Sequence, residues 1–111
     1  MLRTAIAVLP VLLLIVGAVA LPPLARAESP AETFGDHCAR CHGGGGKADS
    51  EISRTLKVRP LVHDAHLARL SAVQIADLVE EDPKHAGVVK LPRDTLEGAA
   101  AFVKQLAAQA E

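Results

Sequence analysis

The strongest constraint on this chain is the segment Cys38-Ala39-Arg40-Cys41-His42, which holds the only two cysteines among 111 residues. On a helix these cysteines lie one turn apart, and a histidine follows them directly. The rest of the chain offers little for a core, because Phe34 and Phe102 are its only aromatic residues. A short chain this poor in large side chains needs a disulfide, a metal or a bulky cofactor to hold it together. We expect the cysteine segment to supply that support.

Residues 1–27 have the pattern of a secretory signal peptide. Arg3 provides a short positive start, and the uncharged run 4–25 is interrupted by paired prolines. Ala25-Arg26-Ala27 then offers a cleavage site. The remaining residues, 28–111, are enough for one small domain. An uncleaved membrane anchor is the alternative, because the uncharged run is nearly long enough to cross a bilayer.

Every strong pattern after residue 27 is helical, and no segment alternates with period two for long enough to predict a strand. Capping boxes at Ser29–Glu32 and Ser71–Gln74 begin two helices, the first running to about Cys41 and the second closed by Pro83. Pro92 opens the last helix. Its expected buried stripe is Leu96, Ala99, Ala100, Val103, Leu106 and Ala107.

Shorter elements are expected between these helices. Asp64 is placed to cap a short helix through Leu70, and a turn of helix is expected at Asp49–Leu56. Gly43–Gly46 stops the first helix and is a loop, because no Gly-Lys-Ser or Gly-Lys-Thr helix start follows it. The fold class predicted from these patterns is all-α.

Cys-x-x-Cys-His is the attachment signature of c-type haem. Two thiols one helical turn apart can add to the two vinyl groups on one edge of the porphyrin, and the next residue places its imidazole under the iron. We therefore predict one covalent haem c, held by Cys38 and Cys41, with His42 as the proximal ligand. The haem would also supply the apolar core that the chain lacks.

Three other interpretations of the cysteine pair stay open. A zinc site needs about four ligands, and there is no second cysteine pair. A thioredoxin-like redox pair expects a βαβ setting, which is absent from the pattern. A structural disulfide suits an oxidising compartment but leaves the adjacent histidine and the glycines unexplained.

With these residues, the chain resembles the small monohaem class I cytochromes c over nearly all of residues 28–111. Phe34 matches the family's aromatic residue four positions before the first cysteine, and Gly43 opens a similar glycine loop. Phe102 resembles the aromatic residue of the C-terminal helix that packs on the first helix. The resemblance implies a cytochrome c-like fold with about four short helices around one covalently bound haem.

The resemblance also extends to the segment Arg59-Pro60-Leu61, which is similar to the family's Pro-Leu turn. In that family the proline carbonyl accepts the Nδ1–H of the proximal histidine, which fixes the tautomer and raises the basicity of the ligand. This implies that the carbonyl of Pro60 faces His42 and belongs to the haem-binding site.

Methionine is where the chain departs from that family. Most members use a methionine in the loop before the last helix as the sixth iron ligand. The only methionine here is Met1, which leaves with the signal peptide. The mature protein must therefore use another ligand or leave the position open.

His85 is the favoured sixth ligand, because it lies in the loop 84–91, where the family keeps its methionine. His37 lies near the attachment edge and cannot easily reach the far face of the haem. His63 and His66 follow the Pro-Leu turn on the proximal side, and we expect both on the surface. The alternatives are His63 or His66 as ligand, a lysine of the loop 84–91, or no strong side-chain ligand.

Two axial ligands let the iron cycle between Fe(III) and Fe(II) without binding a substrate, so we expect an electron carrier rather than an enzyme. It would be periplasmic, because c-type haem is attached outside the cytoplasm, and would act between redox partner proteins. Since methionine raises haem potentials, a site with two histidines predicts a lower one. An open sixth position would instead make a haem-based ligand-binding or sensing protein. A peroxidase would need a distal acid–base group that the sequence does not offer.

The net charge of the mature chain bears on which partners it can bind. Without Arg3 and Arg26, two of the 12 basic residues, the mature chain keeps 10 basic and 13 acidic side chains and a formal charge of −3. No basic patch stands out, so nucleic acid is not an expected partner. We expect a monomer, with membrane association only if the signal peptide is retained.

Overall fold

The computed structural model describes residues 17–21, 28–87 and 89–110. The predicted signal peptide, residues 1–27, falls largely outside these described residues, and its cleavage stays a prediction. Within the described part of the chain, no helix has the length and apolar character needed to cross a membrane.

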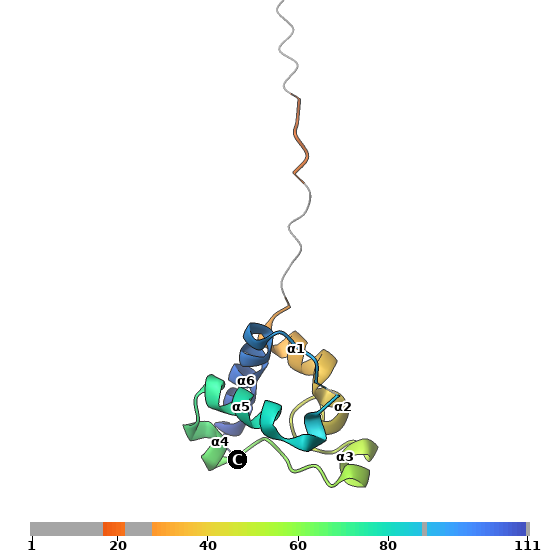
Figure 1. Cartoon of the computed structure of the whole chain (residues 1–111), viewed down its shortest axis with the longest axis vertical. Coiled ribbons are helices and arrows are strands. Elements are labelled where there is room, and N and C mark those ends of the chain that lie inside the picture. The colour runs from red at the N-terminus through yellow and green to blue at the C-terminus, as the bar shows by residue number, and fades with distance from the viewer. Residues whose placement is uncertain (1–16, 22–27, 88, 111) are drawn as a thin grey trace, which may run out of the picture.

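The described part of the chain is all-α, as predicted, and contains no strand. Figure 1 shows α1 and one end of α6 at the top of the folded part, α4 at the lower left, and α2 and α3 on the right. The elements are α1 (Pro30–His37), α2 (Ala39–His42), α3 (Glu51–Leu56), α4 (Ala65–Arg69), α5 (Ala72–Glu81), the 3-10 turn η1 (Pro83–His85) and α6 (Arg93–Ala107).

Helix number is where the prediction of about four helices falls short, because the structure describes six and a 3-10 turn. The predicted first helix is divided into α1 and α2 at Cys38, whose φ of −118° departs from helical geometry. Hydrogen bonds nevertheless continue across the division, from Cys38 N–H to Phe34 O (2.8 Å) and from His42 N–H to Cys38 O (3.0 Å). The segment Cys38–His42 is thus the direct continuation of α1.

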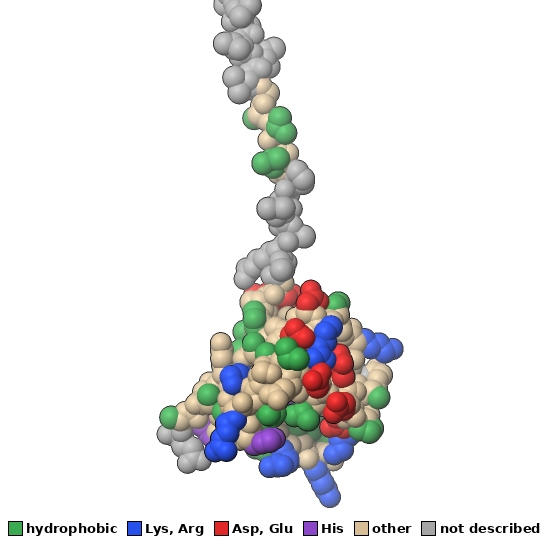
Figure 2. All heavy atoms as spheres, turned by 60° about the vertical axis from the view of Figure 1, so that its left-hand side comes forward, with side chains coloured by type: hydrophobic (Ala, Val, Ile, Leu, Met, Phe, Trp, Pro, Cys, Tyr) green, Lys and Arg blue, Asp and Glu red, His purple; other side chains and the backbone are tan. Residues whose placement is uncertain are grey.

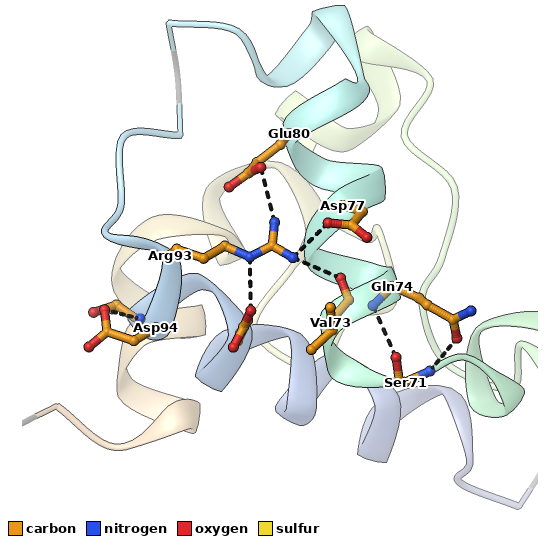
Figure 3. Close-up of polar contacts among 9 residues, drawn as sticks. Ser71, Val73, Gln74, Asp77, Glu80, Arg93 and Asp94 are labelled. Atoms are coloured by element: carbon orange, nitrogen blue, oxygen red, sulfur yellow. Dashed lines mark hydrogen bonds and ion pairs between the residues drawn. The ribbon is translucent and has the colours of Figure 1, made fainter.

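Local capping explains where most helices begin. Both predicted capping boxes are formed, by Ser29 with Glu32 and by Ser71 with Gln74, the second drawn in Figure 3. The side chain of Asp64 accepts from two amides at the start of α4, as predicted. Pro83 ends α5, as expected, but it also begins η1, because proline suits the first position of a helical turn.

The core lies along α6, which packs against α1, α4 and α5. Phe34 of α1 is fully buried, and its ring lies 5.2 Å from that of Phe102 at 55°. This tilted arrangement is a favoured geometry for aromatic pairs, and it confirms the expected contact between the first and last helices. The predicted stripe of α6 is also confirmed, since all of its members are buried: Leu96, Ala99, Ala100, Val103, Leu106 and Ala107.

Two basic side chains of α6 fix the neighbouring helices. Lys104 Nζ donates to the carbonyls of Ala68 and Leu70, both at 2.7 Å, and so satisfies oxygens that the end of α4 leaves without helical partners. Arg93 holds α5 through Asp77 and Glu80. Because η1 follows α5 directly, the placement of α5 also sets the position of His85.

Arg93 lies among three carboxylates that line the seam between α5 and α6 (Figure 3). It bonds Glu97 at 2.9 Å, Asp77 at 2.6 Å and Glu80 at 3.0 Å. Hydrogen bonds to Glu97, Asp77 and Glu80, in that order of importance, raise the pKa of Arg93. The Nη2 that bonds Asp77 also donates to the Val73 carbonyl at 3.1 Å. The cluster is therefore a structural clamp between the two helices.

Candidate functional site

The candidate site lies where the end of α2 faces η1. The imidazole rings of His42 and His85 lie close together, with centroids 6.2 Å apart and ring planes inclined by 32°. The structure therefore brings together the two histidines that the sequence predicts as iron ligands, although they come from segments far apart in the chain.

Cys38 and Cys41 flank one turn of helix immediately before His42. Both thiols are free and partly buried, and Cys38 packs against the edge of the core. Burial, and secondly the neighbouring Cys41, raise the pKa of the Cys38 thiol. Catalytic redox pairs of this spacing have a lowered thiol pKa instead, and the described residues form no βαβ unit. The geometry therefore gives no support to the thioredoxin-like interpretation.

The loop after His42 depends on two of its glycines. Gly43 and Gly46 have φ of +80° and +70°, which residues with a side chain rarely adopt. A Cβ on Gly46 would lie 2.8 Å from the Cδ1 of Leu106, so a side chain at this position would have to displace the end of Leu106. The Gly46 carbonyl accepts from the Leu61 amide at 2.7 Å. This bond ties the loop to the Pro-Leu turn.

The hydrogen bond predicted between His42 and the Pro60 carbonyl is absent from the structure. The Nδ1 of His42 is buried and has no hydrogen-bond partner, so the expected bond to the Pro60 carbonyl is not formed. Pro60 is exposed, and its turn is held through Leu61 and Gly46 instead. A buried nitrogen without a partner is costly, by about 1–3 kcal/mol. The assignment of Pro60 to the site rests on the sequence alone.

Two serines at the start of α3 support the cysteine segment. Ser53 is 1% exposed, and its hydroxyl donates to the Cys41 carbonyl. Ser50 caps α3 and donates to the Arg40 carbonyl at 3.3 Å. Carbonyls at the end of a helix lack helical partners, so these hydroxyls satisfy the end of α2 and hold it in place. Sequence reasoning missed them, although two serines after a glycine loop were a visible signal.

Replacing Ser53 with alanine is expected to lower the free energy of unfolding by about 1–3 kcal/mol, because the Cys41 carbonyl loses its buried donor. Urea unfolding of the purified chain measures the change. Thr55→Ala is the matched control, since it removes an exposed hydroxyl of the same helix that bonds within the helix. That control should change the free energy by less than about 0.5 kcal/mol. Equal losses in the two variants would contradict the supporting role.

His85 is held by a short turn rather than by a long helix. Asp82 Oδ1 accepts from the Lys84 amide at 2.9 Å, and the His85 amide donates to the Asp82 carbonyl at 2.9 Å. The histidine lines a cavity of about 170 Å³ whose other walls are mostly apolar. Those walls are Val79, Glu80, Ala86, Val89, Leu91 and Leu96. The site thus has an apolar side at the end of α5.

The surroundings of His42 favour its neutral imidazole. Burial, and secondly the nearby His85, lower the pKa of His42. A lowered pKa means that the ring stays uncharged down to a more acidic pH than an exposed histidine does. Neutral imidazole is the form that binds a metal.

The donor set indicates what kind of metal fits. Within the described ranges, no group of three or more His, Cys, Asp or Glu residues could hold a metal ion. A structural zinc needs four protein ligands, which this pair does not offer. Two metal–imidazole bonds in line, each about 2.0–2.1 Å long, separate the ring centroids by roughly 6.2–6.5 Å. The observed centroid distance of 6.2 Å lies within this range, so the spacing of the two rings matches that of two imidazoles on one metal ion.

The other three histidines lie apart from the pair. His37 lies 3.9 Å from Glu28, and His66 is exposed on α4. His63 is also exposed, and its Nδ1 donates to the Gln109 carbonyl at 2.6 Å, which supports its left-handed backbone at φ +54°. The prediction that His63 and His66 are surface residues is confirmed. The contact of His63 with the end of the chain was not foreseen.

Comparison with known proteins adds no relative: no protein-family model, curated protein or solved structure matches the chain. Its function has to be argued from its own residues and their geometry.

Proposed function

We propose that this chain is a c-type cytochrome that carries single electrons through one haem. The haem is attached to Cys38 and Cys41 and ligated by His42 and His85. The facing of the two imidazoles, with centroids 6.2 Å apart, carries the proposal. A six-coordinate haem iron asks a protein for two axial nitrogens, because the porphyrin supplies the four equatorial ones. The chain offers that pair directly beside two free thiols one turn apart.

The arrangement of helices supports a cytochrome c-like fold around this haem. The segment that carries the cysteines continues α1, which packs on α6 through Phe34 and Phe102. The other ligand comes from the loop that joins α5 to α6. The partly buried apolar residues that border the core include Leu61, Val79 and Leu91, which are available to cover an apolar ring.

Each residue of the site has one task in this proposal. The Cys38 and Cys41 thiols each add S–H across a vinyl C=C bond, so two thioethers form and no electrons are exchanged. His42 and His85 would both hold the iron and would leave it no free position for a substrate. The bound iron supplies a one-electron Fe(III)/Fe(II) couple.

Location and partners belong to the same proposal. Residues 1–27 would direct the chain to the periplasm, where its donor and acceptor are other redox proteins and the chain itself is not an enzyme. On the face drawn in Figure 2, acidic side chains gather on the right with basic side chains among and beside them, and further Lys, Arg and His side chains lie on the left and along the lower end. Such an arrangement orients weak, fast docking of a partner of complementary charge.

The test is a spectrum of the chain purified from a host that attaches haem c. We expect one haem per chain that acidified solvent does not extract, low-spin spectra in both oxidation states, and no rapid CO binding by the reduced protein. A chain without covalent haem would refute the proposal. A high-spin spectrum with rapid CO binding would refute ligation by His85 and favour the sensing alternative.

A further inference from the structure

One nitrogen of the His85 ring is not satisfied by any hydrogen bond. Its Nδ1 is buried and has no hydrogen-bond partner, although the ring as a whole is partly exposed. Asp82 Oδ2 lies 3.9 Å from this nitrogen. That distance is too long for a hydrogen bond, but it brings a carboxylate oxygen within reach of a small side-chain rotation.

The position of the Asp82 carboxylate is set by a second contact. Its Oδ1 accepts from the Lys84 amide at 2.9 Å and caps η1. The cap uses one oxygen and leaves Oδ2 on the side of His85. Glu80 also lines the cavity beside His85, but its Oε2 is bound to Arg93 at 3.0 Å. Asp82 is therefore the carboxylate placed to accept a hydrogen bond from Nδ1 of His85.

We infer that Asp82 is a positioning residue for the distal ligand: its Oδ2 accepts the Nδ1–H of His85, and the Nε2 of that ring is left for the iron. This inference rests on the proposed function. A histidine that binds a metal commonly donates its other ring N–H to a carboxylate or carbonyl, which fixes the tautomer and raises ligand basicity. A more basic axial ligand stabilises Fe(III) over Fe(II) and so lowers the reduction potential.

Asp82→Asn tests the inference because asparagine keeps the cap. Its side-chain carbonyl can still accept from the Lys84 amide, whereas its NH2 group cannot accept from His85. We expect the ferrous form to gain about tenfold over the ferric form in redox titration, a rise of about 59 mV for a one-electron couple. Glu81→Gln is the matched control, since it removes one negative charge from the adjacent, exposed position. It should give less than half of that shift.

The outcomes separate this inference from the function on which it rests. If the wild-type chain carries no haem, the proposed function fails and the inference with it. If the wild type carries low-spin haem and the two variants shift equally, only the inference fails, because charge alone then accounts for the change. A larger rise in Asp82→Asn than in Glu81→Gln supports it.

A measurement on the wild type decides the matter even if Asp82→Asn does not take up haem. In the reduced, low-spin protein the Nδ1 proton of His85 is expected as a slowly exchanging NMR resonance, with Overhauser contacts to the Hβ protons of Asp82. Rapid exchange of that proton with solvent, or contacts to another acceptor, would overturn the inference.

Discussion

When serine replaces both Cys38 and Cys41, all haem is expected to become extractable by acidified solvent, whereas none is extracted from the wild type. Each serine removes one thiol that forms a thioether. His42 and His85 remain and can still ligate haem, so reversible binding survives while the covalent tether is lost. The haemochrome spectrum measures the same change, because each restored vinyl group shifts its bands to longer wavelength. The haemochrome bands of the two single variants should lie between those of the wild type and those of the double variant.

Arg40→Ser is the matched control for this experiment. It places a serine between the two cysteines at an exposed position, and the thiols stay intact. The contact of Ser50 with residue 40 is also kept, because it uses the backbone carbonyl. This variant should retain all of its haem covalently. Haem that stays attached in the double serine variant after denaturation would contradict attachment through the cysteines.

A covalently held haem would matter to this fold because the protein core is small. The buried stripe of α6 contains three alanines, Ala99, Ala100 and Ala107, and Phe34 is its largest partner from α1. Small side chains bury little apolar area, and each buried CH2 contributes only about 0.8 kcal/mol. In the proposed holoprotein, a covalently held apolar ring would add contact area. The composition of α6 and the cysteine motif thus make sense together.

Much of the fold could be predicted because its signals are local. A capping box such as Ser71 with Gln74 links residues three apart, and the stripe of α6 follows from helical period alone. The contact of Phe34 with Phe102 came from the family resemblance, and the structure confirms it.

What sequence reasoning missed depends on how distant segments meet. The bond from Ser53 to the Cys41 carbonyl requires the path of the glycine loop, which no local pattern encodes. The division at Cys38 is a change in backbone angle within an otherwise helical pattern. The prediction of His85 as a ligand uses its position in the loop before α6, and the structure brings its ring to a centroid distance of 6.2 Å from that of His42. Its bond to iron stays a proposal.

His85→Ala is expected to change the ferric haem from low spin to high spin and to open the reduced protein to CO. If His85 ligates the iron as proposed, CO binds the wild type only in the fraction of molecules in which His85 has left the iron. If that fraction is about 1%, removing the side chain raises the apparent CO affinity about 100-fold. Absorption spectra and CO titration measure both effects. The reduction potential should change with them, because an axial nitrogen is lost.

The remaining histidines provide the controls that locate the effect. His63→Ala and His66→Ala remove rings that the structure places on the surface, one of them bonded to Gln109. Both variants should keep low-spin spectra and stay closed to CO. An unchanged low-spin spectrum in His85→Ala would remove this residue from the iron, and a high-spin spectrum in either control would assign the ligand there instead. Because the control rings lie outside the His42–His85 pair, the comparison separates loss of a ligand from a general disturbance of the fold.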